Sequence, residues 1–342
     1  MIPPRRAIVA GHICLDIIPD VSAIEPGIFN ANFRPGHMLE AGAATLSTGG
    51  PVSNTGLALQ KLGVPVKLIA KVGDDSFGRV IERIVNAIEP DLLAGMKFDP
   101  QATTSYTIII SPPHIDRIFL HCPGANHDFG SADVSAEQLA QADLLHFGYP
   151  PVMRRIYSND GRELADLMRR AKTQGLTTSL DLCYPDPHSE AGRLDWLALF
   201  RSVLPRVDVF APSLEELLFM LRRQTLDDLA ARGSVVDQAT PELLHDISAE
   251  IMEMGAKIVL IKLGARGAYL RTAGVAALDQ LGLAAPSDRA AWANRELWAP
   301  CFDVEVVGTT GSGDATIAGF LSALLRDGTP EDAMTMAVAV GA

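Results

Sequence analysis

The sequence predicts an α/β fold in which helices flank a central, mainly parallel sheet that carries a small β lid. Apolar strand patterns alternate with amphipathic helix patterns along most of the 342 residues, and this alternation is typical of parallel sheets. The pattern changes to a β-hairpin between Thr103 and Cys122, and residues 16–48 are irregular. We therefore expect one domain over residues 1–342, with lid segments inserted at approximately 16–48 and 100–123.

Before the hairpin, the chain is expected to form two strand–helix units. The pair Gly49-Gly50 precedes the first helix, and Gly63 ends it in the position where glycine commonly closes a helix. A short stretch of the irregular segment also has a strand-like pattern. In chain order, the expected elements are a strand at 7–13, a short strand at 36–40, a helix at 53–62, a strand at 66–72 and a helix at 79–88.

After the hairpin, the strand–helix alternation resumes. The expected helices lie at 135–141, 160–174, 214–222, 241–254, 315–325 and 330–340, with a polar, partly helical insertion at 223–240. The expected strands lie at 144–147, 177–181, 207–210, 257–263, 268–270 and 304–307. Residues 271–299 show no clear periodicity, and we expect an irregular surface excursion there.

Charge and cysteine content exclude several classes of protein. The chain has 41 Asp and Glu residues against 29 Lys and Arg residues, a net charge of -12, which argues against nucleic-acid binding and against docking on an anionic membrane. No segment approaches the roughly 20 uninterrupted apolar residues of a membrane helix. The four cysteines form no C-x-x-C pair, so we expect reduced thiols in a cytoplasmic protein.

A glycine-rich turn near the C-terminus is the main candidate for chemistry. Gly311-Ser312-Gly313 follows an apolar run and precedes a helix, and Asp314 stands at the start of that helix. The free N–H groups of a helix N-terminus favour a phosphate or a developing oxyanion. A carboxylate beside such an anion pocket suggests phosphoryl transfer to an alcohol. A plain helix cap and an ordinary turn are the alternative interpretation of the same residues.

Two separated motifs resemble the signatures of the PfkB-type, ribokinase-like carbohydrate kinase family. The spacing Gly49-Gly50…Asn54…Gly63…Gly73 resembles the N-terminal signature, and residues 307–321 resemble the C-terminal signature, D-T-x-G-A-G-D. The resemblance extends from Gly11 to Phe320. It implies a ribokinase-like fold with the β lid over a sugar site. It also implies ATP- and Mg²⁺-dependent phosphorylation of a hydroxyl group of a sugar or related polyhydroxy compound.

The resemblance assigns a role to each matching residue. Asp314 matches the catalytic base that takes a proton from the substrate hydroxyl. The backbone of Gly311, Ser312 and Gly313 matches the anion hole for the transferred phosphoryl group. The residues that match contacts to substrate hydroxyls are Asp16, Gly49, Gly50 and Asn54. The residues assigned to the nucleotide are Lys262, Gly264, Gly267 and Thr309.

ATP and Mg²⁺ are the cofactors that the resemblance implies. Glu216 matches the Glu of the N-x-x-E element, which organises Mg²⁺ through water, and one carboxylate plus ATP phosphates suits an ion that keeps several waters. Val52 and Gly56 depart from the small, hydroxyl-type or Ala residues of the N-terminal signature. Three further residues depart from the family pattern: Gly308 replaces the first Asp of the C-terminal signature, Ser213 the Asn of N-x-x-E, and Cys183 the Asn of D-x-N. Gly308 weakens the expectation of the monovalent-cation site that some relatives have. Relatives also continue past the position of Ala342 with helical sequence that helps to form the adenine pocket.

Two other functions stay open on these residues. A nucleoside kinase would need aromatic side chains around the base, and Phe29, Phe33 and Phe119 are the candidates. A non-catalytic sugar or nucleotide sensor is suggested by the three departures, whereas Asp314 and its Gly-Ser-Gly turn favour an enzyme. We expect a small sugar-like substrate and no nucleic-acid or membrane partner. By analogy with the family, we also expect a homodimer through the exposed lid edge.

Three residues on or near the hairpin are candidates for substrate choice. Arg117, His121 and Asn126 carry side chains that can meet a hydroxyl or a carboxylate. For Arg117, a solvated strand residue is the favoured interpretation.

Overall fold

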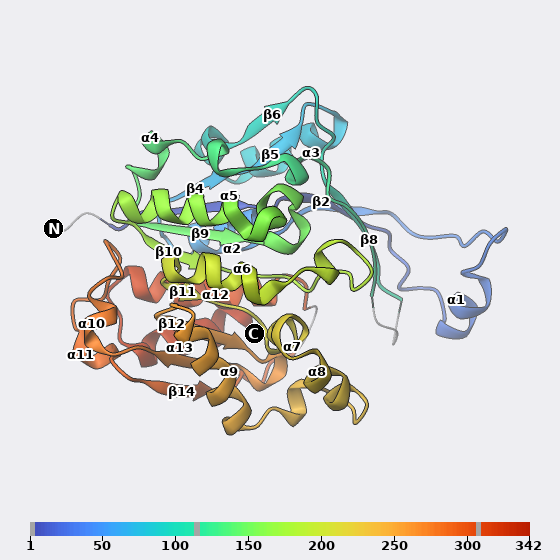
Figure 1. The fold of residues 1–342 in the computed structure, drawn as a ribbon. Helices are drawn as coiled ribbons and strands as arrows, with labels where there is room; N and C mark the ends of the chain where they lie inside the picture. The colour runs from blue at the N-terminus through green and yellow to red at the C-terminus, as the bar shows by residue number, and fades with distance from the viewer. Residues whose placement is uncertain (1–3, 113–116, 306–308) are drawn as a thin grey trace.

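The computed structural model describes residues 4–112, 117–305 and 309–342 (Figure 1). In these residues, the main sheet consists of β1 (Ala7–Gly11), β4 (Val66–Ile69), β9 (Leu144–Gly148), β10 (Thr177–Leu180), β11 (Val209–Phe210), β12 (Ile258–Lys262), β13 (Ala268–Thr272) and β14 (Glu296–Ala299). Their spatial order is β14-β13-β12-β11-β10-β9-β1-β4. In this sheet, β4, β1, β9, β10, β11 and β12 are parallel to one another. β13 is antiparallel to β12, and β14 is antiparallel to β13. The expected central, mainly parallel sheet is confirmed.

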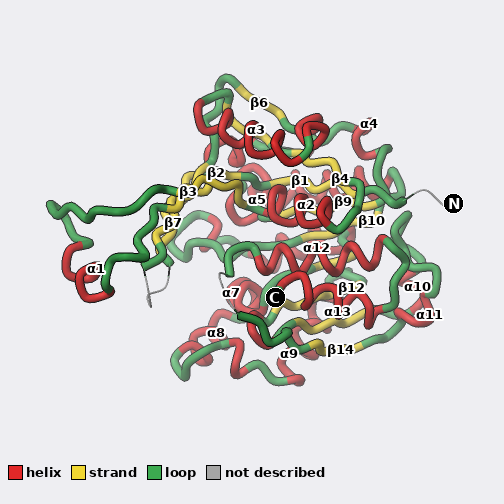
Figure 2. The backbone as a smooth tube through the Cα atoms, turned by 180° about the vertical axis from the view of Figure 1, so that it is seen from behind, coloured by secondary structure: helices red, strands yellow, loops and turns green. Residues whose placement is uncertain are grey.

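Helices cover both faces of this sheet, as Figures 1 and 2 show from opposite sides. They are α2 (Pro51–Lys61), α3 (Ser76–Ile88), α4 (Ala136–Leu139), α5 (Arg154–Thr173), α6 (Trp196–Val203), α7 (Leu214–Leu221), α8 (Arg223–Ala230), α9 (Pro241–Glu253), α10 (Val275–Leu278), α11 (Arg289–Trp292), α12 (Ser312–Leu325) and α13 (Pro330–Gly341). Successive strand residues point to opposite faces, so Ile8 and Ala10 belong to the core on the face covered by α5, α6 and α9, while Ala7 and Val9 belong to the core on the face covered by α2, α12 and α13.

A second sheet of four strands stands beside the main sheet, and we call it the small sheet. It consists of β2 (Cys14–Ile18), β3 (Thr45–Gly49), β7 (Tyr106–Ile110) and β8 (Ile118–Cys122), in the order β3-β2-β7-β8. The segment between β2 and β3 carries α1 (Pro26–Asn32), which projects away from the main sheet in both views (Figures 1 and 2). The expected hairpin is confirmed, because β7 and β8 pair antiparallel from Tyr106↔Cys122 to Ile110↔Ile118.

Two of the expected strands before the hairpin are wrong. The strand expected at 36–40 is absent. Its Met38 side chain is 95% exposed, and β3 instead pairs with β2. The run 66–72 is split, because β4 ends at Ile69 and the chain passes into β5 (Lys71–Gly73), which pairs with β6 (Lys97–Asp99). Both parts of that run contain buried apolar residues, so apolarity alone does not reveal the change of sheet.

The region before the glycine-rich turn also differs from expectation. Residues 271–299 are not irregular: they form α10, α11 and the edge strand β14, in which Trp298 pairs with Tyr269. The short, half-exposed β14 lacks the continuous apolar run that marks the inner strands. The strand end expected at 304–307 is absent at Val304 and Glu305, and its other two residues lie outside the described residues. The expected helix at 160–174 belongs to α5, whose helical conformation is interrupted from Ser158 to Gly161.

A close helix contact fixes the position of α12, the helix that begins at the glycine-rich turn. A Cβ atom added at Gly319 would lie 2.2 Å from the carbonyl oxygen of Met336 on α13. Two helix backbones approach this closely only where one residue lacks a side chain. Gly319 therefore sets the spacing between α12 and α13.

We predict that Gly319→Ala lowers the free energy of unfolding by about 1–3 kcal/mol through overpacking. Alanine is the better helix former by about 1 kcal/mol, so destabilisation would report the contact with Met336 and not helix propensity. Chemical denaturation monitored by circular dichroism measures the change. Gly27→Ala in α1 is the matched control, because a Cβ atom there meets nothing within 4 Å. An equal effect at both positions would contradict the assignment.

Candidate active site

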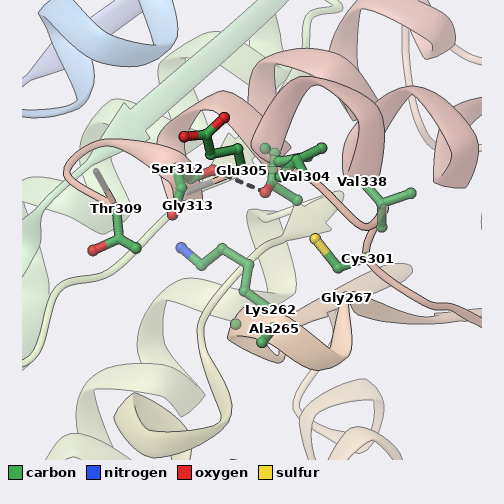
Figure 3. Close-up of a pocket in the computed structure, with 14 residues that line it drawn as sticks. Lys262, Ala265, Gly267, Cys301, Val304, Glu305, Thr309, Ser312, Gly313 and Val338 are labelled. Atoms are coloured by element: carbon green, nitrogen blue, oxygen red, sulfur yellow. Dashed lines mark hydrogen bonds between the residues drawn. The ribbon is translucent and has the colours of Figure 1, made fainter. Parts of the chain in front are cut away.

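Two cavities meet at the turn that begins α12. The first cavity, of about 420 Å³, lies between α12 and the turn after β12 (Figure 3). It is lined by Lys262, Gly264, Ala265, Gly267, Cys301, Val304, Glu305, Thr309, Ser312, Gly313, Thr316, Val338, Gly341 and Ala342. The second cavity, of about 350 Å³, lies between the main and small sheets. It is lined by His12, Cys14, Asp16, Gly50, Asn54, Thr107, Ile109, Phe119, His121, Tyr149, Val152, Cys183, Tyr184, Thr310, Gly311 and Asp314.

Asp314 lies in the first turn of α12 and lines the second cavity with a side chain that is almost fully buried. Its Oδ2 accepts hydrogen bonds from Nδ2 of Asn54 over 2.9 Å and from the hydroxyl of Tyr149 over 2.7 Å. Its Oδ1 accepts from the hydroxyl of Thr55 over 3.3 Å. Burial raises the pKa of Asp314 above its usual value, and the hydrogen bonds from Asn54 and Tyr149 and the charge of Lys262 oppose that rise.

The glycine-rich turn presents backbone groups between the two cavities. Gly311 precedes α12 with a φ of 79°, a conformation that favours glycine, and it lies against the side-chain amide of Asn54. Ser312 and Gly313 line the first cavity, whereas Gly311 and Asp314 line the second. The N-terminus of the 14-residue helix α12 therefore lies at the junction of the cavities, where an anion is favoured. Gly308 lies outside the described residues.

Residues expected to contact substrate hydroxyls gather in the second cavity. Asp16 in β2 is buried, and burial raises the pKa of its carboxyl. Its Oδ1 accepts from the thiol of Cys14 over 3.3 Å. Gly49 lies against this carboxylate, because a Cβ atom there would be 2.3 Å from Oδ2 of Asp16. Gly50, with a φ of 84°, lies against His12. Asp16, Gly50 and Asn54 line the cavity, whereas Gly49 contacts Asp16 without lining it.

His12 is a buried residue of this cavity without a hydrogen-bond partner among the described residues. Neither of its ring nitrogens has a protein partner. Its ring lies 6.0 Å from that of Tyr149 in a stacked arrangement and 5.2 Å from that of His121. Burial lowers the pKa of His121 to about 4 and that of His12 well below its usual value, so both imidazoles are neutral at neutral pH. Sequence reasoning gave His12 no role in a site and missed its place in the cavity.

Lys262 and the glycines after β12 line the first cavity. Nζ of Lys262 donates to Oδ1 of Asp181 over 2.6 Å, and this carboxyl group is fully buried at the end of β10. Burial alone lowers the pKa of Lys262, but the charges of Asp181 and Glu216 outweigh it and raise that pKa, so the ammonium stays charged. Gly267 passes close to β14, because a Cβ atom there would lie 2.0 Å from the carbonyl oxygen of Ala299.

Glu216 lies at the start of α7 and is buried. Its Oε2 accepts from the backbone N–H of Ser213 over 2.7 Å, and the hydroxyl of Ser213 accepts from the backbone N–H of Glu216, so the two form a capping box. Ser213, the departure from N-x-x-E, thus serves as a helix cap. In the described parts of the chain, no three His, Cys, Asp or Glu side chains group as metal ligands. Among the described residues, Glu216 therefore provides a single carboxylate ligand, and protein side chains alone do not complete a metal site.

The hairpin of the small sheet reaches the glycine-rich turn through Arg117. Its guanidinium donates to the hydroxyl of Thr309 over 2.9 Å and also to that of Thr310. The ring of Phe119 lies beneath the guanidinium, 5.5 Å from centroid to Cζ. Arg117 is therefore not a freely solvated strand residue, which corrects the favoured interpretation. Asn126 is buried, forms hydrogen bonds with the backbone of Ile13 and lines neither cavity.

Tyr149, Thr55 and Asp181 are site residues to which sequence reasoning gave no role. Tyr149 and Asp181 directly follow buried parallel strands, β9 and β10, whose carboxyl ends are where open α/β sheets bind ligands. Thr55 adjoins Asn54 on α2, and its contact with Asp314 requires knowledge of how α2 packs on α12. The strand ends were a usable signal for the first two residues, whereas no sequence signal identified Thr55.

Comparisons with known proteins agree with this geometry. A sequence model of pfkB family carbohydrate kinases matches residues 5–342. An ATP-dependent ribose-1-phosphate kinase from Halopiger xanaduensis is 25% identical over 337 residues, 98% of this chain and 90% of that protein. Fructokinase-2 from Oryza sativa subsp. japonica is 22% identical over 334 residues, 95% of this chain and 81% of that protein.

The fold is also found among solved structures. Ribokinase from Arabidopsis thaliana, complexed with ribose and ATP, aligns with a TM-score of 0.71 at 17% identity, over 99% of this chain and 92% of that one. No helix in residues 4–112, 117–305 and 309–342 is both long and apolar enough to cross a membrane.

We predict that Asp181→Asn lowers the free energy of unfolding by about 3–5 kcal/mol, because it removes the carboxylate that pairs directly with the buried ammonium of Lys262. Chemical denaturation measures the change. Asp166→Asn is the matched control, since its pair with Arg169 is exposed and is worth about 1 kcal/mol or less. The double variant Asp181→Asn with Lys262→Met should regain part of the loss. A double variant as unstable as the sum of the two single variants would argue against the pairing.

Proposed function

The chain belongs to the pfkB family of carbohydrate kinases, and we propose that it transfers the γ-phosphoryl group of ATP to a hydroxyl group of a sugar or related polyhydroxy compound. The observation that carries the proposal is the position of Asp314. A buried carboxylate stands at a helix N-terminus, at the junction of two cavities. One cavity suits the nucleotide and the other the acceptor.

The transfer can be written with the residues at the junction. An acceptor hydroxyl in the second cavity gives its proton to the carboxylate of Asp314 while its oxygen bonds to the γ-phosphorus. The bond between that phosphorus and the β–γ bridging oxygen breaks, and ADP leaves with the electron pair. The backbone N–H groups of Gly311, Ser312 and Gly313 would stabilise the charge on the transferred group.

The first cavity is assigned to ATP on its lining. Lys262, Gly264, Gly267 and Thr309 surround it, and Figure 3 shows Lys262, Gly267 and Thr309 on different sides of it. Mg²⁺ keeps several waters and binds oxygens, so Glu216 together with the phosphates of ATP would hold it. A bound Mg²⁺ would neutralise part of the phosphate charge.

The second cavity is assigned to the acceptor. Asp16 and Asn54 offer groups that bind hydroxyls, and the small sheet supplies the outer wall through Ile109, Phe119 and His121. Such a wall excludes water from the transferred phosphoryl group and limits hydrolysis. The acceptors in the names of the similar proteins, ribose 1-phosphate and fructose, are both polyhydroxy compounds.

A nucleoside is the second candidate acceptor, because two half-exposed aromatic side chains line the second cavity. Phe119 is 51% exposed and Tyr184 is 46% exposed, so both have free ring surface for a base. Phe29 and Phe33 stack on each other in the α1 region and do not line this cavity.

ADP release from Mg²⁺-ATP across ribose, ribose 1-phosphate, fructose and adenosine tests these assignments. Stimulation by a sugar with none by adenosine supports the sugar kinase, and the reverse supports the nucleoside kinase. If ATP binds and the panel is silent, a non-catalytic sensor becomes the better interpretation.

We predict that Asp314→Asn lowers kcat by about 10²–10⁴-fold, the contribution expected of a general base. The affinity for ATP should change little, because the substitution removes a proton acceptor and not the lining of the first cavity. Steady-state kinetics and calorimetry measure the two effects. Asp332→Asn, in the exposed first turn of α13, is the matched control and should keep its turnover. Full turnover by Asp314→Asn would overturn the assignment of the base.

The acid side of the pH–rate profile should report Asp314. A base works only when deprotonated, so kcat/KM should fall as pH drops through the pKa of Asp314, which burial raises above its usual value. Tyr149→Phe removes a hydrogen bond that lowers this pKa, so its acid limb should move to higher pH. Tyr157→Phe, whose hydroxyl contacts Glu190 outside both cavities, is the matched control. An unshifted limb in Tyr149→Phe would show that another group controls the profile.

A further inference from the structure

Lys262 holds a charged group at the junction of the two cavities. It is the only lysine or arginine among the described residues that line either cavity. Its side chain passes over the glycine-rich turn: a Cβ atom added at Gly313 would lie 3.5 Å from Cδ and 3.7 Å from Nζ of Lys262. Figure 3 shows the ammonium directed toward Gly313 and Thr309. The positive charge therefore lies beside the backbone groups proposed as the anion hole.

The ammonium is fixed in this position by a single carboxylate. Within the described residues, Nζ donates one hydrogen bond, to Oδ1 of Asp181. An ammonium group has three N–H donors, so two remain for a ligand. Asp181 is itself fully buried, and its Oδ2 has no partner among the described residues. Asp181 thus orients Lys262 without using up its capacity to donate.

We propose that Lys262 is a catalytic residue whose ammonium binds the transferred phosphoryl group, with Asp181 as its positioning residue. This inference rests on the proposed kinase function. The transferred group must cross the glycine-rich turn from the first cavity to the second, and Nζ of Lys262 lies at that turn. Negative charge is spread over the three equatorial oxygens of the phosphoryl group during transfer. A pre-oriented, desolvated ammonium stabilises that charge without reorganisation, and Lys262 keeps its proton throughout.

Arg117 is the other cation near the turn and provides a matched comparison. It approaches from the small sheet, its guanidinium is occupied by the hydroxyls of Thr309 and Thr310, and it lines neither cavity. Lys262, in contrast, comes from the main sheet and lines the first cavity. Of these two cations, Lys262 is the one placed to distinguish ATP from ADP by direct contact with the γ-phosphoryl group.

The decisive measurement is the binding of Mg²⁺-ATP and Mg²⁺-ADP by calorimetry, without acceptor, to the full chain and its variants. Lys262→Met should weaken ATP binding by about 10- to 100-fold, the loss of one charge-assisted hydrogen bond, with little change for ADP. Arg117→Met should leave the ratio of the two affinities unchanged. With an acceptor present, Lys262→Met should also lower kcat by about 10²–10³-fold.

Two further variants separate contact with the phosphoryl group from an effect on folding. Lys262→Met leaves the Asp181 carboxylate buried without its cation, so the double variant Asp181→Asn with Lys262→Met restores neutrality and should show the same loss of ATP preference. Asp181→Asn alone keeps the ammonium but loses the carboxylate that orients it, so it should lower the preference for ATP by less than Lys262→Met does. Circular dichroism confirms that each variant is folded at the temperature of the assay.

The outcomes distinguish this inference from the proposed function. An equal loss of ATP and ADP affinity in Lys262→Met, or loss of ATP preference in Arg117→Met instead, overturns the role of Lys262 and leaves the kinase intact. Failure of the unsubstituted chain to bind ATP overturns both. If ATP preference depends on Lys262 while every acceptor in the panel is silent, the contact is supported and only the acceptor assignment fails.

Discussion

The carboxylate of Asp314 has lost almost all contact with solvent, and this burial has to be compensated by donors from other elements. Asn54 and Thr55 supply two of them from α2, and Tyr149 supplies the third from the segment after β9. The geometry of the site therefore depends on how α2, α12 and the main sheet pack together. The close approach of α12 to α13 at Gly319 also contributes to this packing, because it fixes the position of the helix that carries Asp314.

The parallel sheet explains why residues far apart in the chain converge on this carboxylate. His12, Tyr149 and Asp181 follow β1, β9 and β10, and Lys262 ends β12. All four are at the carboxyl ends of parallel strands, and these ends lie at one edge of the sheet. The site thus combines that edge of the main sheet with the N-terminus of α12, while the small sheet adds the outer wall of the second cavity.

Local patterns in the sequence were sufficient for the parallel sheet, most helices and the hairpin of β7 and β8, because each depends on periodicity within a few residues. They failed where a strand forms because a distant strand pairs with it. A strand was expected at 36–40, whereas β3 lies at Thr45–Gly49, and β14 was not expected. The site shows the same division. The motif around Asp314 was visible in the sequence, but the bond from Thr55 depends on the packing of α2 against α12.

Two buried carboxylates at strand ends of this chain are neutralised differently, and the difference bears on the chemistry. Asp208, away from the site, pairs with both Lys172, at 2.6 Å, and Lys257, at 2.9 Å. Asp181 pairs with Lys262 alone, and the charges of Glu216 and Asp314 act on the same ammonium.

Three carboxyl groups act on one ammonium in this buried region, and burial together with the excess of neighbouring carboxyl groups raises the pKa of Asp181 well above its usual value. The same excess keeps Lys262 protonated, so its ammonium is available when the phosphate oxygens enter the first cavity. Asp208, with two lysines for one carboxylate, has no such imbalance, and this difference sets the pair of Lys262 and Asp181 apart from a purely structural ion pair.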